Sequence, residues 1–333
     1  MVDKKPIISI IIPMYNVENY IAICLNSIIQ NDLKNVEVII VNDGSTDNSR
    51  TIAERYQAKY SQIRIFDKEN AGVSRARNYG LSKSTGDWIW FVDSDDAIKK
   101  GSLEYIKKMI LTCYSNLDVL IFGYLRFEEK KNIDKSCSLN RIDDSKIISK
   151  FQAMGTLLDE RFATFPWNKI FRRELFKKIA FPEDRIYTED LAIIYKLYDK
   201  ATHFRLENTA LYLYRIRENG LTHNLSTKKL KDSALSHYEM YTFFKANYSS
   251  LSTKLRRETL ISAISFFHRL NKSQIQLYPD LIKFLNQDIY MKDCNARYKI
   301  EIWAFKKCYP LFVTIGMIGK ILRRLKNLKK GKS

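Results

Sequence analysis

The sequence predicts an α/β fold with a doubly wound, mostly parallel sheet, flanking helices and a C-terminal helical region. Runs of β-branched residues alternate with segments whose apolar residues recur at helical spacing. Polar, loop-forming residues directly follow three of these runs. With 333 residues, 45% of them hydrophobic, the chain is long enough for one large domain or two ordinary ones.

Four strands and three helices are expected before residue 93. The runs IISIIIP at 7–13, VEVIIV at 36–41, IRIF at 63–66 and DWIWFV at 87–92 are typical of buried strands. Helices are expected at 17–30, from Ser45 or Thr46 to about Tyr60, and at 71–84. This alternation implies right-handed crossovers between parallel strands.

Polar motifs follow the first, second and fourth strands: PMYN, NDGSTD and DSDD. Ligands of doubly wound sheets bind beyond the carboxyl ends of the strands, so these loops are expected to form one site. Asp93, Asp95 and Asp96 repel one another there unless a cation is present. Carboxylate oxygens suit Mg²⁺ or Mn²⁺, which also bind substrate phosphates. The alternative is that these aspartates only cap the next helix.

Beyond residue 100 the pattern is less regular. A strand is expected at 117–127, a polar, mobile loop at 130–146, and mainly helix from about 226 onward. These changes predict one domain at 1–225, with halves at 1–100 and 101–225, and a helical region at 226–333.

The segment 302–333 contains nine Lys or Arg and no acidic residue. Pro310 is placed to begin a helix, and the stretch YPLFVTIGMIG at 309–319 is too short to span a bilayer. We expect a basic amphipathic segment that lies on the cytoplasmic face of the inner membrane, where each basic residue contributes about 1 kcal/mol. The alternative is a helix that packs on the body of the protein with its Lys and Arg in water.

Four ordered motifs resemble the family-2 inverting glycosyltransferases with the GT-A fold: SIIIPMYN, VIIVNDGSTDNS, ENAGVSRARNYGL and WIWFVDSDD. The resemblance is strong over residues 7–127 and looser to about 222. It implies a UDP-sugar donor, a divalent metal, Mn²⁺ or Mg²⁺, and transfer of a hexose or N-acetylhexosamine. The implied acceptor is a sugar hydroxyl of a bacterial surface polysaccharide, a lipooligosaccharide, a glycoprotein glycan or a lipid-linked glycan.

The resemblance assigns the UDP-sugar to a set of strand-end residues. Tyr15 would lie along the base and ribose, and Asp43 would accept from the uracil N3–H, although Asp43 and Gly44 are also typical of a plain turn. Arg77 would lie near the nucleotide, where a guanidinium suits phosphate, and Arg75 is its competitor. The full set of expected contacts is Pro13, Tyr15, Asp43, Arg77, Asp93 and Ser94.

The same resemblance assigns the metal to the DxD pair. Asp93 and Asp95 are the expected ligands, and Asp95 is the better candidate for direct contact. His223 is a possible third ligand, because imidazole suits Mn²⁺, although most lone histidines are not ligands.

The acceptor side is expected around the TED motif at 188–190. Inversion requires a general base opposite the leaving diphosphate, and we predict Asp190 in preference to Glu189, which is placed on the acceptor side. Trp167 matches a position that lines the acceptor, with a core tryptophan as the alternative. Three roles stay open for Arg215 and Arg217: contact with the diphosphate, contact with the acceptor, or a solvated position at the surface.

Composition limits the remaining classes. The net charge of +19 makes nucleic acid and anionic lipid plausible partners, but no nucleic-acid-binding motif is present and much of the excess lies in the final segment. A nucleotidyltransferase is the other alternative, although PMYNVENY lacks the glycine and lysine of a phosphate loop. The cysteines are scattered, and neither a signal sequence nor an apolar run of 18 residues is found, so a cytoplasmic location is expected. The basic C-terminal segment adds the expectation that the protein associates with the membrane face. The oligomeric state is open.

Overall fold

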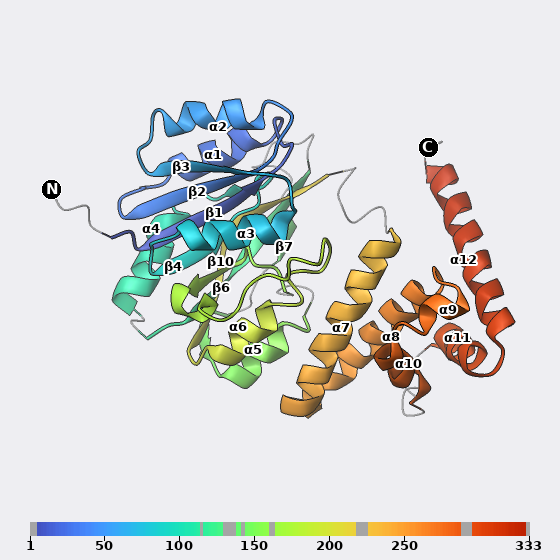
Figure 1. The fold of residues 1–333 in the computed structure, drawn as a ribbon. Helices are drawn as coiled ribbons and strands as arrows, with labels where there is room; N and C mark the ends of the chain where they lie inside the picture. The colour runs from blue at the N-terminus through green and yellow to red at the C-terminus, as the bar shows by residue number, and fades with distance from the viewer. Residues whose placement is uncertain are drawn as a thin grey trace. The chain divides into compact units, whose positions relative to one another are not determined.

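The computed structural model describes residues 5–113, 116–128, 138–140, 144–159, 164–217, 226–287 and 295–330. The chain divides into two compact units, residues 1–223 and 224–333. The first unit contains the sheet, and the described part of the second is helical (Figure 1).

The first unit is built on one mixed sheet with the strand order β3-β2-β1-β4-β9-β6-β10-β5. β1 to β4 pair in parallel, as do β6 and β10, whereas β9 lies antiparallel between β4 and β6. β5 and β8 pair antiparallel with β10, and β7 with β6. The strands are β1 (Ile8–Met14), β2 (Val36–Asp43), β3 (Ile63–Lys68), β4 (Trp88–Phe91), β5 (Ala97–Ile98), β6 (Val119–Glu128), β7 (Ser138–Asn140), β8 (Lys146–Ile148), β9 (Lys169–Arg172) and β10 (Phe204–Ile216).

Helices cover both faces of this sheet, as predicted for an α/β fold. Val38 and Ile40 of β2 pack in the large core with α1 and α4, whereas Ile39 and Val41 point to the opposite face, where they meet Ala76 of α3. The helices of this unit are α1 (Ile21–Ile29), α2 (Ser49–Gln57), α3 (Val73–Lys83), α4 (Ser102–Lys108), α5 (Lys150–Thr156) and α6 (Ile194–Lys200).

The predicted fold class is confirmed, but two local predictions differ from the structure. α1 begins a few residues later than the apolar spacing predicts, and α2 a few residues later than the expected cap at Ser45 or Thr46, because short turns precede them. The predicted loop at 130–146 contains β7 and the start of β8 among its described residues. β7 is a three-residue strand that depends on pairing with Tyr124–Arg126 of β6, and no local sequence pattern indicates such a contact.

The second unit contains the helices α7 (Thr227–Asn247), α8 (Ser252–Phe267), α9 (Lys272–Ile275), α10 (Pro279–Asn286), α11 (Ala296–Lys307) and α12 (Tyr309–Lys330). The first turn of α12 packs through Phe312, whose ring stacks on His268 at 4.1 Å. Gly316 lies against the same imidazole, because an added Cβ would come within 2.3 Å of His268 Nδ1. Within the residues described, none of the helices combines the length and apolar composition that crossing a membrane requires.

Candidate active site

The sheet opens where β1 and β4 end. Their pairing runs to Ile11 and Phe91, and the Val92 N–H still donates to the Ile11 carbonyl oxygen at 3.0 Å. The next bond of a parallel ladder would come from the N–H of residue 13, which proline lacks. Pro13 is therefore a buried residue of β1 that ends the ladder. Tyr15 follows it with 48% of its surface exposed, so its ring is accessible to a flat base.

Asp96 anchors the loop that follows β4. Its buried carboxylate accepts from the Tyr212 hydroxyl and the Arg215 N–H, both at 2.7 Å. The same hydroxyl accepts from the Asp93 N–H at 3.1 Å, and Arg215 Nε donates to the Asp95 carbonyl oxygen at 2.6 Å. Burial, and then the charges of Asp95 and Asp93, raise the pKa of Asp96 well above its ordinary value. Asp96 is thus a structural carboxylate that fixes the loop to β10.

Asp93 and Asp95 remain partly accessible beside this anchor, with 27% and 19% of their side chains exposed. Asp93 Oδ1 accepts from Arg77 Nη2 at 3.0 Å, and Asp95 Oδ2 pairs with Arg217 Nη2 at 2.5 Å. Burial, and then the charge of Asp93, raise the pKa of Asp95, while Arg217 opposes the shift. A divalent cation would relieve the repulsion that raises this pKa.

The donor set fits Mg²⁺ or Mn²⁺. These cations bind through one or two carboxylates and complete their shell with water and phosphate oxygens. In the described ranges, no group of three or more His, Cys, Asp or Glu side chains is arranged to hold a metal ion. Ser94, between the two aspartates, is buried. His223, the predicted third ligand, lies outside the described residues.

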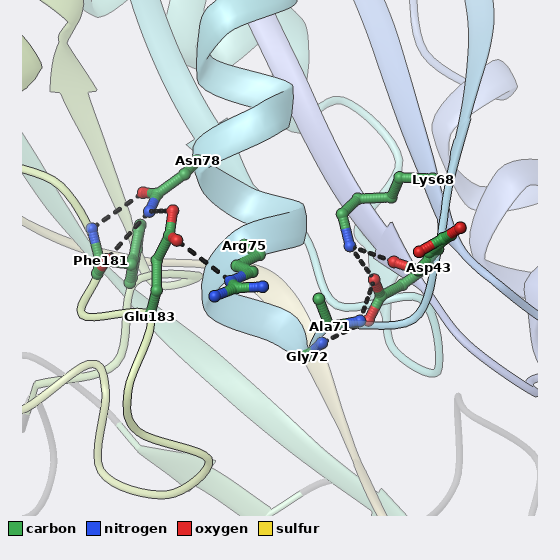
Figure 2. Close-up of polar contacts among 9 residues, drawn as sticks. Asp43, Lys68, Ala71, Gly72, Arg75, Asn78, Phe181 and Glu183 are labelled. Atoms are coloured by element: carbon green, nitrogen blue, oxygen red, sulfur yellow. Dashed lines mark hydrogen bonds and ion pairs between the residues drawn. The ribbon is translucent and has the colours of Figure 1, made fainter.

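Arg77 joins this acidic edge to the TED motif. Its buried guanidinium binds Asp93 through Nη2 and Glu189 through Nη1, the latter at 2.8 Å. Burial alone would lower the pKa of Arg77, but the two carboxylates more than offset that effect and raise it. Arg75, its competitor in the RARN motif, instead pairs with Glu183 at the surface, at 3.0 Å (Figure 2).

Asp190 is half-buried next to Glu189. Burial, and then the charge of Glu189, raise the pKa of Asp190 to about 7, although the Leu191 N–H donates to Oδ1 at 2.7 Å. Thr188 precedes this pair with φ +55°, a left-handed conformation that β-branched residues rarely adopt. Such strain concentrates at functional sites. A carboxylate that titrates near neutral pH is suited to accept a proton.

Asp43 holds the turn that leads into α3 (Figure 2). Its buried carboxylate accepts from the N–H groups of Ala71 and Gly72, at 3.0 and 2.8 Å, and pairs with Lys68. Gly44 follows with φ +73°, as a tight turn requires. The turn predicted as an alternative is therefore present. Oδ2, which accepts from Gly72, has a second lone pair for a donor such as an imide N–H.

Trp167 lies within an aromatic cluster and is 4% exposed. Its ring stacks against Phe165, Tyr212 and Tyr214, with centroid distances of 4.8, 4.6 and 5.3 Å. This burial favours the core role over a sugar-facing role. Phe165 and Tyr214 are half-buried and are the members of this stack that reach the surface.

Sequence reasoning missed two residues of the site. The sequence gives no role to Tyr212, yet its hydroxyl binds both ends of the DSDD loop. Lys169 is fully buried at the start of β9, where Nζ donates to the Phe165 carbonyl oxygen at 2.7 Å. Burial holds the pKa of Lys169 well below its usual value, and the charge of Asp190 partly opposes that shift. The sequence does contain a signal for this buried lysine: Lys169 directly precedes the apolar pair Ile170 and Phe171.

Known proteins resemble this chain in sequence and fold. Over 227 residues it is 34% identical to glycosyltransferase GlyA of Streptococcus pneumoniae serotype 4, covering 67% of this chain and 32% of GlyA. It is 31% identical to the uncharacterized glycosyltransferase EpsJ of Bacillus subtilis, covering 65% of this chain and 63% of EpsJ. The crystal structure of S. aureus TarS 1-349 in complex with UDP-GlcNAc shares the fold, with a TM-score of 0.66 and 23% identity over 94% of this chain and 91% of TarS.

The chain thus spans less than two thirds of GlyA and EpsJ. Residues 9–180, more than half of the chain, match the family model described as glycosyl transferase family 2. Together with the identity to GlyA and the shared fold, this match shows that the chain belongs to glycosyl transferase family 2.

Proposed function

We propose that this protein is a metal-dependent inverting glycosyltransferase. It moves a hexose or N-acetylhexosamine from a UDP-sugar to a sugar hydroxyl of a bacterial surface glycan. The observation that supports this most strongly is Arg77, one buried cation that binds both Asp93 at the strand end and Glu189 beside Asp190. A nucleotide-side carboxylate and a proton-accepting carboxylate therefore lie in one site.

The donor lies along the ends of β1, β2 and β4. Tyr15 offers an accessible ring to the uracil base, and Asp43 Oδ2 has capacity for its imide N–H. Asp93 and Ser94 lie where the diphosphate and sugar would follow. TarS, which shares this fold, is in complex with UDP-GlcNAc, so that nucleotide sugar is the first donor to test.

Asp93 and Asp95 would hold Mn²⁺ or Mg²⁺ at this site. When bound, the metal supplies a Lewis acid that neutralises charge on the departing diphosphate. Arg217 pairs with Asp95, so its guanidinium would lie near the metal and the diphosphate as a second positive charge. Arg215 is held by Asp96 and Asp95 and acts in positioning the loop.

Asp190 is the general base. The acceptor hydroxyl oxygen attacks the anomeric carbon on the face opposite UDP, and the new C–O bond forms as the bond to the diphosphate oxygen breaks. The hydroxyl proton moves to Asp190, whose pKa of about 7 leaves it substantially ionised at neutral pH. Glu189, fixed by Arg77, raises that pKa and lines the acceptor side.

A donor screen tests this function. The protein is incubated with Mn²⁺ and UDP-glucose, UDP-galactose, UDP-GlcNAc or UDP-GalNAc, and release of UDP is measured. We expect release from one or two donors, and a loss of at least about a hundredfold in Asp95→Asn and Asp190→Asn, with unchanged circular dichroism. Normal turnover in Asp190→Asn would remove the base assignment. Release of pyrophosphate from UTP and a sugar 1-phosphate, with no release of UDP from any UDP-sugar, would indicate a nucleotidyltransferase.

The C-terminal helices are proposed to bind the membrane surface. Ile300 and Trp303 of α11 and Met317 and Ile318 of α12 are each more than half exposed. α12 packs through Phe312 and Gly316, so Met317 and Ile318 lie on a different face of the helix. The sequence from 320 to 330 adds six Lys or Arg and no acid. Apolar side chains beside basic ones suit an anionic leaflet, where lipid-linked acceptors reside.

A further inference from the structure

Two reciprocal hydrogen bonds attach the chain near the TED motif to α3 (Figure 2). Asn78 Nδ2 donates to the Phe181 carbonyl oxygen at 2.9 Å, and the Phe181 N–H donates to Asn78 Oδ1 at 2.9 Å. One side-chain amide thus pairs with both backbone groups of Phe181, as a neighbouring strand would.

The ring of Phe181 is fixed at the same point. It is 1% exposed and meets Phe91 edge-on, with ring centroids 5.2 Å apart. The Arg77 guanidinium lies over this ring at 5.2 Å. Phe91 ends β4 directly before the DSDD loop, and Arg77 binds Asp93 and Glu189. Phe181 therefore contacts the strand and the cation that organise the site.

The chain from Phe181 to Asp190 has no helix or strand of its own. Its placement therefore depends on attachments to neighbouring elements. The Arg75–Glu183 pair is about half exposed on both sides, and such pairs contribute little. The bonds of Asn78, made at a buried phenylalanine, are stronger than this surface pair. They hold the start of the segment, and the Arg77–Glu189 pair holds its other end.

We propose that Asn78 is a positioning residue that holds residues 181–190 so that Asp190 faces the donor. This inference rests on the proposed role of Asp190 as the base. The contacts of Asn78 are with the 181–190 chain, and the nucleotide-side residues Asp43 and Asp93 have other supports. Its loss is therefore expected to impair turnover more than nucleotide binding.

The test compares Asn78→Ala with Asn31→Ala in the full chain. Asn31 is a matched control: it is buried, donates to the Ser27 carbonyl oxygen at 2.8 Å and accepts from the Leu103 N–H at 3.3 Å, away from residues 181–190. Three quantities are measured: the Kd of UDP with Mn²⁺ by calorimetry, UDP release from the donor selected by the screen, and hydrogen exchange of peptides covering 181–193.

For Asn78→Ala we expect a Kd within about twofold of wild type, release lowered about ten- to a hundredfold, and at least about tenfold faster exchange at 181–193. Asn31→Ala should leave release and this exchange unchanged. Asn78→Asp keeps the acceptor oxygen but sets a second carboxylate oxygen against the Phe181 carbonyl oxygen and Glu183, so release should fall at least as far as in Asn78→Ala. If Asn78→Ala folds poorly, Asn78→Asp decides the question by the same three measurements.

The proposal is overturned if Asn78→Ala keeps wild-type release and exchange, if it loses UDP binding as strongly as release, or if Asn31→Ala loses release equally. Asp190→Asn is measured in parallel to separate this proposal from the base assignment. Normal release in Asp190→Asn means that the base assignment is wrong, and the exchange at 181–193 then tests the attachment alone.

Discussion

The three aspartates of DSDD have different environments although they lie within four positions. Asp96 is buried and accepts from β10, whereas Asp93 and Asp95 are partly exposed and pair with Arg77 and Arg217. The difference follows from the direction of each side chain after β4 ends. One carboxylate builds the loop, and the other two are accessible to a cation.

The Tyr212 hydroxyl is expected to stabilise this loop. Tyr212→Phe removes a donor to buried Asp96 and an acceptor for the Asp93 N–H, which should lower the free energy of unfolding by about 1–3 kcal/mol. Urea denaturation measures this, and calorimetry should show weaker binding of UDP with Mn²⁺. Tyr214→Phe, two residues along β10 on a half-buried ring, is the control. Equal effects of the two substitutions would contradict the assignment.

The pH dependence of turnover should follow Asp190. Only the ionised carboxylate accepts a proton, so kcat/KM for UDP release should rise with pH through an apparent pKa of about 7. Glu189→Gln removes the charge that raises this pKa, so the rise should move to lower pH.

A pH series of initial rates checks this, with the exposed carboxylate variant Glu174→Gln as a control that should keep the wild-type profile. A profile in Glu189→Gln that coincides with wild type would show that another group sets the rise.

The sequence motifs indicate which residues are candidates for the site, but they do not indicate which side chains contact one another. The motifs single out Asp93, Asp95 and Glu189 as candidates. Arg77 was expected only near the nucleotide, and its contacts with both Asp93 and Glu189 were not predicted. Glu189 lies 112 positions from Arg77, and no local pattern encodes such a contact. The buried tyrosine hydroxyl of Tyr212 was missed for the same reason.

At the scale of elements, α3 is the helix that connects the sheet to the site. It lies close over β1 and β2 because Gly80 has no side chain: an added Cβ would come within 2.4 Å of Ile11 Cγ2 and 3.4 Å of Val41 Cγ2. The same helix carries Arg77 and Asn78. Its height above the sheet therefore sets where both side chains reach.

Gly80→Ala is expected to destabilise the protein by about 1–3 kcal/mol, because the methyl group must displace Ile11 or lift α3. Gly155→Ala in α5 is the opposite case. An added Cβ there meets no atom within 4 Å, and alanine suits a helix better by about 0.5–1 kcal/mol. Thermal denaturation should show a lower melting temperature for Gly80→Ala and a slightly higher one for Gly155→Ala. Destabilisation of equal size in both would refute the packing argument.

The parallel pairing of β1 to β4 could be predicted, and the antiparallel insertion of β9 could not. β1 to β4 are apolar runs separated by helices, so their parallel pairing follows from crossover rules. β9 has four residues, KIFR, and its place between β4 and β6 is set by pairing with strands far away in the chain. Short strands of this kind have no periodicity to detect.

At the scale of the whole molecule, the charge of +19 is concentrated toward one end of the chain and leaves an acidic edge on the sheet of the first unit. Both the basic C-terminal segment and the acidic DSDD motif can be located in the sequence alone. The sequence could not distinguish membrane binding of this segment from packing on the body, because it does not show which apolar side chains are exposed and which are buried.

Vesicle flotation distinguishes these uses of the second unit. Wild-type protein should float with vesicles that contain phosphatidylserine, and less so with phosphatidylcholine alone or at high salt. Met317→Glu combined with Ile318→Glu should abolish flotation. Leu277→Glu changes a residue of the same unit that is 73% exposed and should have no effect. Flotation that is absent in wild type, or lost equally in both variants, would favour packing on the body.

The doubly bound guanidinium of Arg77 also has a consequence for catalytic efficiency. Its two nitrogens are fixed in one plane, so they define the spacing between the carboxylates they hold, which one ammonium on a flexible stem could not do. The spacing between Asp93, on the proposed donor side, and Glu189, on the proposed acceptor side, is thereby preorganised when the chain folds. In the proposed mechanism, the entropy of ordering these protein groups is lost during folding, so it does not have to be lost again when the substrate binds.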